Sequence, residues 1–278
     1  MSYHRILTIQ DVSCVGQCSM TVALPILSAC GQETAILPSA VLSTHTGGFK
    51  GFTFRDLADD MPGIRRHWES EKLTFDAIYT GYLGGVKQVD YTLDILASCL
   101  APGGRTVVDP AMADHGRLYY GFDEAYVAAM RRLCAAADVI LPNVTEACFL
   151  TGTEYRETYD EAYIAALLDR LLALGAGSVL MTGVGYAPDE TGVLLFDGKT
   201  ADHYRHVRLD KSYHGTGDVY ASAFTGAWLS GRTPNEAARI AADYTVDCIR
   251  TTMADPAHWY GVKFEAALPG LVRRLNEV

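Results

Sequence analysis

The stretch His214-Gly215-Thr216-Gly217-Asp218 is followed at once by an apolar run over residues 219–230. Two glycines directly before a predicted helix let the backbone turn its N–H groups toward a ligand. The N-terminus of the helix adds about half a positive charge, which favours an anion there. Asp218 then lies in the first helical turn, beside the predicted anion site. The same residues also fit a plain tight turn in which Asp218 only complements the helix dipole.

Outward from this stretch, short apolar runs alternate with helical patterns over most of the chain. Alternation of this kind predicts βαβ units and a doubly wound α/β sandwich around a buried parallel sheet. The predicted strands are residues 5–10, 76–80, 106–109, 138–141 and 178–182, and the predicted helices are 19–30, 86–99, 123–136, 160–174, 218–230 and 234–251. The Gly-rich and aromatic segment 42–54 fits no helix and is expected to form a flap or a small edge hairpin.

Composition excludes several functional classes. The chain has 278 residues, with 33 acidic against 23 basic ones and a net charge of −10, which argues against a nucleic-acid partner. Seven scattered cysteines indicate reduced thiols and a cytoplasmic location. No apolar run reaches the ~20 residues of a membrane span, and no signal peptide is visible, so no membrane partner is expected.

Polar side chains follow two neighbouring predicted strands. Asp109 begins the stretch DPAMAD, and Asn143 and Glu146 lie in LPNVTE. In open α/β sheets, ligands bind beyond the carboxyl ends of the strands, so these side chains should meet near the anion site. Oxygen ligands of this kind suit Mg²⁺ that carries nucleotide phosphates. Asn143 and Glu146 by themselves also form the pattern of a helix capping box.

Together, HGTGD before a late helix, DPxM after a middle strand and PNxxE after the next resemble the vitamin kinase branch of the ribokinase superfamily. Within that branch the sequence is similar to the pyridoxal and pyridoxamine kinases, over about residues 5–251. The stretches Ile9-Gln10, LSTHTGG at 42–48 and Gly81-Tyr82-Leu83-Gly84 also match that family. The resemblance implies one ribokinase-like kinase domain over 1–278, a three-layer α/β/α sandwich with a mostly parallel central sheet and a small flap.

The resemblance also implies an activity: ATP-dependent phosphorylation of the 5′-hydroxymethyl group of pyridoxamine, pyridoxal or pyridoxine, in a homodimer. Asp218 would be the catalytic base, and the backbone N–H groups of Gly215, Thr216 and Gly217 would form the anion hole. ATP would be bound by Asp109, Asn143, Glu146 and Thr182, with Asp109 and Glu146 holding Mg²⁺ mostly through water. The vitamer would be bound by Asp11, Thr46, Gly47 and Tyr82. The adenine would lie near 203–213, and 116–119 would form a lid.

Three positions depart from the family pattern. Asp11 stands where the family usually has Ser, Ala113 replaces a glycine of the lid hinge, and His214 precedes the GTGD stretch where some relatives have a cysteine. An ionised carboxylate at position 11 favours a cationic partner, which predicts a preference for pyridoxamine over pyridoxal. The alternative is that Asp11 contacts the pyridine nitrogen or points to solvent.

Three other interpretations compete with a B6 kinase. A hydroxymethylpyrimidine kinase normally has a Gly-rich segment after the first strand, which DVSCVGQCSM at 11–20 does not match. A sugar kinase would need an N-terminal Gly-Gly signature that the chain lacks. A non-catalytic protein that binds B6 or a nucleotide on the same fold would not need the base, so the intact GTGD stretch argues against it.

Overall fold

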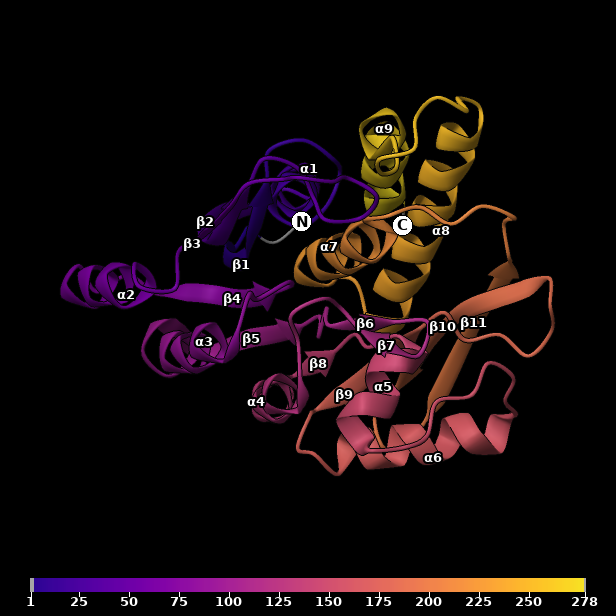
Figure 1. Ribbon diagram of the computed structural model, residues 1–278, viewed down its shortest axis with the longest axis horizontal. Helices are drawn as coiled ribbons and strands as arrows, with labels where there is room; N and C mark the ends of the chain where they lie inside the picture. Colours follow the sequence, from indigo (N-terminus) through magenta and orange to yellow (C-terminus); the bar gives the residue numbers. More distant parts are fainter. Residues whose placement is uncertain (1–2, 278) are drawn as a thin grey trace.

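One mixed β-sheet forms the centre of the molecule (Figure 1). The structure is a computed structural model that describes residues 3–277, and within this range nine strands join in the order β11-β10-β9-β8-β5-β4-β1-β2-β3. The strands of this sheet are β1 (Arg5–Ser13), β2 (Glu33–Leu42), β3 (Phe54–Asp56), β4 (Phe75–Thr80), β5 (Leu100–Val108), β8 (Val139–Ile140), β9 (Ser178–Thr182), β10 (Glu190–Phe196) and β11 (Ala201–Val207).

The six inner strands from β9 to β2 are parallel to one another, as the alternation of strands and helices predicts. Antiparallel strands extend the sheet at both sides: β3 pairs with β2, and β10 pairs with both β9 and β11. The outermost strands carry charged side chains, Arg55 and Asp56 on β3 and Asp202 and Arg205 on β11. On β11, Asp202 forms an ion pair with Arg239 at 3.0 Å.

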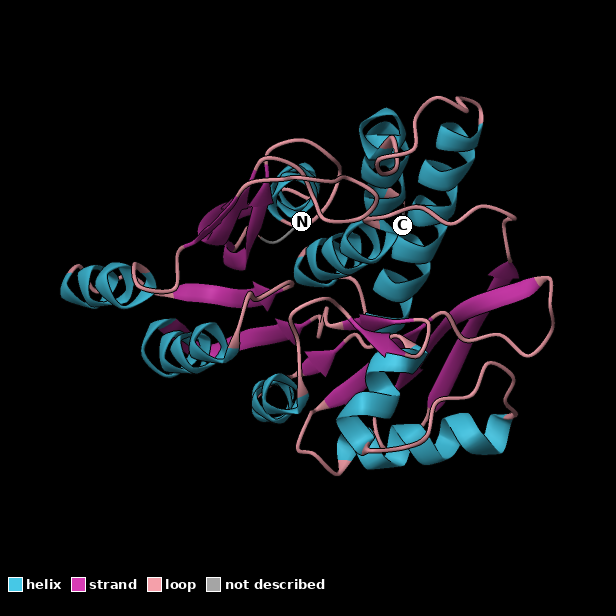
Figure 2. Cartoon of the chain, viewed as in Figure 1, coloured by secondary structure: helices cyan, strands magenta, loops and turns pink. Residues whose placement is uncertain are grey.

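Helices cover both faces of the sheet, which gives the three layers expected of a ribokinase-like fold (Figure 2). They are α1 (Met20–Ala29), α2 (Met61–Ser70), α3 (Val86–Cys99), α4 (Glu124–Ala135), α5 (Val144–Thr151), α6 (Glu161–Leu172), α7 (Thr216–Leu229), α8 (Pro234–Met253) and α9 (Phe264–Asn276). Helices α2 to α6 lie on one face, and α1, α7, α8 and α9 on the other. No helix in the described range is both long enough and apolar enough to span a bilayer.

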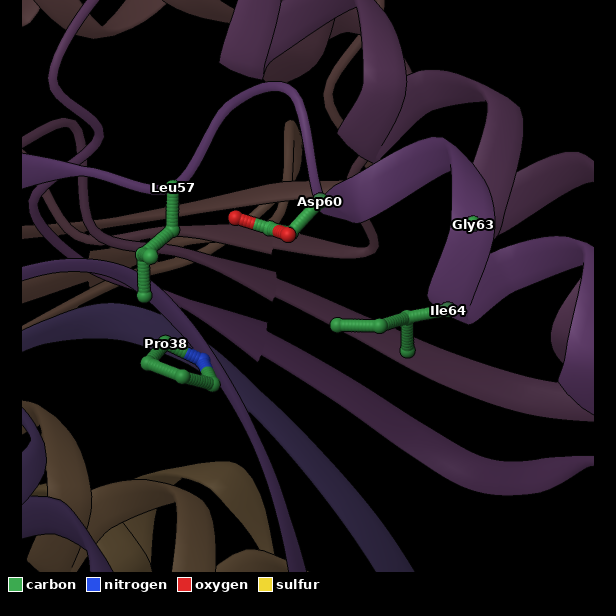
Figure 3. Close-up of a pocket in the computed structure, with 5 residues that line it drawn as sticks. All are labelled: Pro38, Leu57, Asp60, Gly63 and Ile64. Atoms are coloured by element: carbon green, nitrogen blue, oxygen red, sulfur yellow. The ribbon is translucent and has the colours of Figure 1, made fainter.

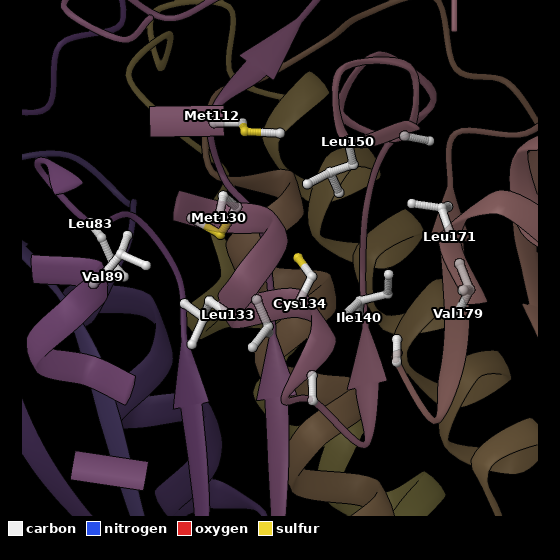
Figure 4. Close-up of a cluster of buried hydrophobic side chains, with 14 of the residues drawn as sticks. Leu83, Val89, Met112, Met130, Leu133, Cys134, Ile140, Leu150, Leu171 and Val179 are labelled. Atoms are coloured by element: carbon white, nitrogen blue, oxygen red, sulfur yellow. The ribbon is translucent and has the colours of Figure 1, made fainter. Parts of the chain in front are cut away.

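Each face of the sheet has its own apolar core. On the first face, Leu83 and Val89 pack with side chains of α4 and β8, including Leu133 and Ile140 (Figure 4). On the second face, Tyr79 of β4 and Val107 of β5 pack against Val219 of α7. Because the inner strands are buried on both faces, their sequences are continuously apolar rather than alternating.

Helix ends follow the capping signals in the sequence. The side chains of Asp123 and Asp160 accept hydrogen bonds from the N–H groups of Tyr126 and Tyr163, at the starts of α4 and α6. Thr233 and Glu236 form a complete capping box at the start of α8. All six predicted helices are confirmed with boundaries within two residues.

Two small hairpins stand above the carboxyl end of the sheet. Residues 40–42 of β2 pair with 54–56 of β3, so the predicted edge hairpin is confirmed, with segment 43–53 as its loop. We call this loop the flap. The second hairpin joins β6 (Ala113–Asp114) and β7 (Arg117–Leu118), and the predicted lid at 116–119 covers the end of its turn, β7 and the next residue.

Candidate active site

The glycine-rich turn before α7 is held closely by the loop after β1. Gly215 is left-handed, with φ of 79°, and an added Cβ would lie 1.8 Å from the backbone oxygen of Gln17. Only glycine fits this position. The hydroxyl group of Thr216 donates to the oxygen of Tyr213 at 3.2 Å. Helix α7 begins at Thr216, so the prediction that Asp218 lies in its first turn is confirmed.

Asp218 is half-buried, and its surroundings make it a stronger base than an ordinary carboxylate. Burial raises its pKa to about 7, and the nearby negative charge of Asp11 acts in the same direction. The backbone N–H of Ser19 donates to Asp218 and offsets part of this rise. A carboxylate with a pKa near neutrality suits general base catalysis at physiological pH.

Asp11 lies near the end of β1, and Tyr82 follows the end of β4. Asp11 is only 4% exposed, and the Ser13 hydroxyl donates to its Oδ2 at 2.9 Å. Burial raises the pKa of Asp11, while hydrogen bonds from Ser19 and Ser13 lower it. Burial, and after it the charge of Asp11, raises the pKa of Tyr82 to about 12. The structure thus brings together the predicted base and two predicted vitamer contacts.

A second group of acids lies at the ends of β5 and the next strand. Asp109 is 8% exposed and Glu146 is 3% exposed. Burial raises the pKa of both carboxyl groups; the charge of Asp218 adds to the rise at Asp109, and the charge of Asp109 adds to the rise at Glu146. Glu146 accepts hydrogen bonds from the N–H groups of Met112 at 3.1 Å and Asn143 at 2.9 Å.

Asn143 and Thr182 complete this end of the site. A β-bridge joins them, and the Nδ2 of Asn143 donates to the oxygen of Ala113 in the β6–β7 hairpin at 2.9 Å. Asn143 and Glu146 also form the full capping box of α5. The capping role that the sequence left open is therefore confirmed. It is compatible with a ligand role, because a carboxylate has about four acceptor positions.

A cavity of about 710 Å³ opens beside Asn143 and Thr182. Asp114 and Tyr155 line it on one side, and Arg208, just after β11, contributes a positive charge on the other. A second hollow of about 490 Å³ lies near α2 and is lined by Pro38, Leu57, Asp60, Gly63 and Ile64 (Figure 3). None of the predicted site residues lines this second hollow.

The flap approaches the glycine-rich turn through histidines. The N–H of Gly47 donates to Nδ1 of His45 at 3.0 Å, so Nε2 of the same ring donates to the oxygen of Tyr260, also at 3.0 Å. The ring of His214 lies beside this segment, where an added Cβ on Gly47 would be 2.5 Å from its Nδ1. Thr46 is exposed.

Aromatic contacts join the flap to the loop after α8, which we call the clasp (residues 254–261). Phe49 packs on Trp259 with ring centroids 4.7 Å apart. His258 contacts Oε1 of Gln17 at 3.0 Å, which links the clasp to the loop after β1. The contacts by which His45, His258 and Trp259 hold the flap and the clasp could not be predicted from the sequence, because contacts between distant loops leave no local pattern.

Ser19 and Tyr119 were also missed as site residues. The strained φ of 53° at Ser19 aims both its N–H and its hydroxyl at carboxylates of the site. Burial, and after it the charges of Glu146 and of Asp114, raises the pKa of Tyr119, so these acids lie near it. A serine before an apolar helix indicates only a helix cap, so this role of Ser19 could not be predicted from the local pattern.

The acidic group fits a magnesium ion by its donor chemistry. Asp109 and Glu146 offer buried carboxylate oxygens and Asn143 an amide oxygen, and hard oxygen ligands of this kind are typical of Mg²⁺ sites. Among residues 3–277, no three His, Cys, Asp or Glu side chains form a ready-made metal cage. Mg²⁺ commonly uses one or two carboxylates together with water and substrate phosphates, which these residues can support.

Comparisons with known proteins show which family this chain resembles. Residues 66–261 match the phosphomethylpyrimidine kinase family. Pyridoxal kinase from Lactobacillus plantarum is 34% identical, with a TM-score of 0.90 and coverage of 97% of both chains. A Bacteroides thetaiotaomicron protein, assigned as a phosphomethylpyrimidine kinase and solved with pyridoxal, is 35% identical, with a TM-score of 0.90 and coverage of 96% of this chain and 95% of that one. A pyridoxine/pyridoxal/pyridoxamine kinase from Bordetella pertussis is 28% identical over 89% of both chains.

Proposed function

Because this chain belongs to the pyridoxal and phosphomethylpyrimidine kinase family and is a kinase-type phosphotransferase, we propose that it phosphorylates a vitamin B6 vitamer with ATP. The reaction would convert the 5′-hydroxymethyl group of pyridoxamine, pyridoxal or pyridoxine into a phosphate ester. One observation carries the proposal: Asp218, with a pKa of about 7, stands beside the glycine-rich turn and near Asp11.

Asp218 would act as the general base. Its carboxylate takes the proton from the 5′-hydroxyl group as that oxygen forms a bond to the γ-phosphorus of ATP. The bond between the γ-phosphorus and the bridging oxygen breaks, and ADP leaves with the electron pair. Phosphoryl transfer depends mostly on positioning and charge stabilisation, so one base and fixed donors are sufficient.

The N–H groups of Gly215, Thr216 and Gly217 would stabilise the transferring phosphoryl group. They point out of the first turn of α7, where the helix dipole favours negative charge. Since the Gln17 backbone fixes Gly215, these donors need little rearrangement during the reaction.

Asp109, Glu146, Asn143 and Thr182 would hold the nucleotide end. The cavity beside Asn143 and Thr182 can receive the phosphates, and Arg208 on its far side contributes a positive charge. A bound Mg²⁺, held by Asp109 and Glu146 largely through water, would neutralise the charge of the phosphates. Without a cation, burial leaves both carboxyl groups with raised pKa values. We place the adenine near 203–213 by the family resemblance.

Asp11, Thr46, Gly47 and Tyr82 would form the vitamer end. Asp11 lies near both Tyr82 and Asp218, so a ring bound beside Asp11 can present its 5′-oxygen to the base. Thr46 would reach the vitamer from the exposed flap. All proposed site residues come from one chain, so the homodimer that we propose would carry two complete sites.

The second candidate is a hydroxymethylpyrimidine kinase, because a Bacillus subtilis protein that is 27% identical over 79% of this chain is a hydroxymethylpyrimidine/phosphomethylpyrimidine kinase. Both substrates present a hydroxymethyl group on a nitrogen heterocycle, and Asp218 could serve either. The test is turnover of ATP with a panel of pyridoxal, pyridoxine, pyridoxamine and hydroxymethylpyrimidine. The proposal is supported if the substrate with the highest kcat/KM in this panel is a B6 vitamer. Turnover of the pyrimidine alone would contradict it.

A further inference from the structure

One histidine of the flap has both of its ring nitrogens in hydrogen bonds, and it has no part in the mechanism above. His45 is only 5% exposed. Its Nδ1 accepts from the N–H of Gly47 at 3.0 Å, and its Nε2 lies 3.0 Å from the oxygen of Tyr260. Because a ring nitrogen that accepts carries no proton, the ring is neutral and its proton is on Nε2. His45 therefore bridges the flap and the clasp in only one of its protonation states.

The neighbouring segments fit closely around this ring. Gly16, in the loop after β1, has φ of 107°, and an added Cβ there would lie 2.1 Å from Cδ2 of His45. The backbone N–H of His45 donates to the oxygen of Val15 at 3.2 Å. The ring of Phe49 meets the imidazole edge-on, with centroids 5.0 Å apart. These contacts leave the imidazole little room to rotate if one of its hydrogen bonds is lost.

The bridge lies beside two residues of the proposed vitamer end. Thr46 and Gly47 follow His45 directly in the chain, and the hydrogen bond from Gly47 closes the turn that they form. The oxygen of Tyr260 also accepts from the N–H of Gln17 at 3.4 Å, and the Gln17 backbone holds the glycine-rich turn. One carbonyl oxygen thus joins the flap to the segment that positions the anion hole.

Protonation of the ring would break this bridge, because a proton on Nδ1 would point at the N–H of Gly47. The titratable groups that act on the ring come from three segments: Asp11 of β1, His214 of the glycine-rich turn, whose ring centroid is 5.4 Å away, and Tyr260 of the clasp. Burial lowers the pKa of His45 below its ordinary 6.5, as does the charge of His214, whereas the hydrogen bond to Tyr260 and the charge of Asp11 raise it. The ring is therefore neutral at neutral pH and takes up a proton only in acid.

We propose that His45 is a positioning residue for the vitamer: its neutral ring ties the flap to the clasp and holds Thr46 and Gly47 in place, and its protonation releases them. This inference rests on the proposed function of the flap in vitamer binding. The affinity for the vitamer should then be highest above the pKa of His45 and fall as the pH drops through it.

The first test is His45→Gln, which keeps a donor for the Tyr260 oxygen but loses the acceptor for Gly47 and does not titrate. The Kd of pyridoxine, which has neither an aldehyde nor an ammonium group at the 4′ position, is measured by calorimetry without ATP. At about pH 8 the variant should bind about 5-fold more weakly than wild type, because one hydrogen bond is lost, and at about pH 5 the two should be equal. Ionisation of pyridoxine itself is common to both proteins and cancels in the ratio.

The second test needs neither a variant nor a ligand. Hydrogen exchange of residues 43–53 in the wild type reports how often the flap opens. After correction for the intrinsic pH dependence of exchange, the flap should exchange about 5-fold faster at about pH 5 than at about pH 8. Helix α8, which does not depend on this hydrogen bond, should keep its protection at both pH values.

His258→Gln is the matched control. The Nε2 of His258, in the clasp, lies 3.0 Å from Oε1 of Gln17, so this ring can donate its hydrogen bond in both its neutral and its charged form. The variant should therefore keep the wild-type pH dependence of pyridoxine binding.

Three results would overturn the inference. They are a ratio of Kd values between wild type and His45→Gln that does not change with pH, flap exchange that does not respond to pH, and loss of the pH dependence in His258→Gln. A flap that responds to pH in a wild-type chain that binds no B6 vitamer would instead contradict the proposed function, and the inference would fall with it.

Discussion

The candidate site has two ends that are held in different ways. The phosphoryl end contains Asp218, Asp109 and Glu146, and the vitamer end contains Asp11, Tyr82 and the flap. At the phosphoryl end, backbone groups fix the acids: Glu146 accepts from two N–H groups, and Asp218 from that of Ser19. At the vitamer end, side chains hold the flap, through His45 and through the packing of Phe49 on Trp259. Backbone contacts tolerate changes of sequence, whereas side-chain contacts do not. We therefore expect the chemistry common to the family at the first end and the substrate specificity at the second.

The largest expected effect tests the base at the phosphoryl end. Asp218→Asn keeps the size of the side chain but removes its basicity, so kcat should fall by about 10²–10⁴. Steady-state turnover with saturating ATP measures this loss, and circular dichroism with an ATP-binding assay shows that the variant is folded. A folded variant with near wild-type kcat would remove Asp218 from the mechanism.

The next prediction separates metal binding from helix capping at the same end. Asp109→Ala and Glu146→Ala should each raise the Mg²⁺ concentration for half-maximal rate about 10- to 100-fold, with a smaller change in KM for the vitamer. Glu146→Ala should also lose about 1 kcal/mol of stability, because the capping box of α5 is broken.

Glu236→Ala is the control for that prediction. It breaks the equivalent capping box of α8, so it should lower the Tm without changing the Mg²⁺ requirement. If neither acid variant alters the Mg²⁺ titration, capping alone explains Asn143 and Glu146, and the metal role of Asp109 falls.

A third prediction concerns the pH dependence of the free energy of unfolding, which the raised pKa of Asp218 should cause. The pKa of Asp218 is about 7 in the fold against an ordinary 3.8, so the folded chain binds more protons than the unfolded chain between these values. Stability then falls as pH rises through this window, and Asp218→Asn removes the effect. The free energy of unfolding of the variant relative to wild type should increase by up to about 2 kcal/mol from about pH 5.5 to about pH 7.

Urea unfolding of both proteins across this pH range measures that difference. Carboxyl groups far from Asp218 titrate alike in both proteins and cancel. The pKa of Asp109, which the charge of Asp218 raises, should fall in the variant and change the difference in the same direction. Parallel curves for wild type and variant would show that the pKa of Asp218 is not raised by the fold.

The smallest expected effect probes specificity at the vitamer end. Asp11 can pair with the 4′-ammonium of pyridoxamine, whereas pyridoxal has an aldehyde there. Since burial raises the pKa of Asp11, we expect a preference of only about 10-fold, at the low end for a charge-assisted hydrogen bond. The ratio of kcat/KM for the two vitamers should fall toward one in Asp11→Ser. An unchanged ratio would mean that Asp11 does not contact the 4′ group.

The elements with strong local signals could be predicted from the sequence, whereas contacts between distant segments could not. Strands and helices with strong local signals, such as α3 at Val86–Cys99, were predicted to the residue. So was the position of Asp218 in the first turn of α7. Strand β2, Glu33–Leu42, was missed because Pro38 and polar residues interrupt its apolar pattern. The pair β10 and β11 was missed because antiparallel edge strands break the alternation of strands and helices.

The unpredicted part of the site consists of contacts between distant segments. Ser19, for example, joins Asp11 to Asp218 through hydrogen bonds from its hydroxyl and N–H groups. Local patterns carry no information of this kind.

The charged outer strands of the sheet bear on how the protein behaves when concentrated. A free strand edge is a template for pairing with another chain, and charges on short or edge strands suppress such pairing. Strand β3 spans only three residues and carries Arg55 and Asp56, while β11 carries Asp202 and Arg205. Both edges are therefore poor starting points for cross-β aggregation. Neutralising Arg55 and Asp56 together would expose the sheet to fibril growth from that side.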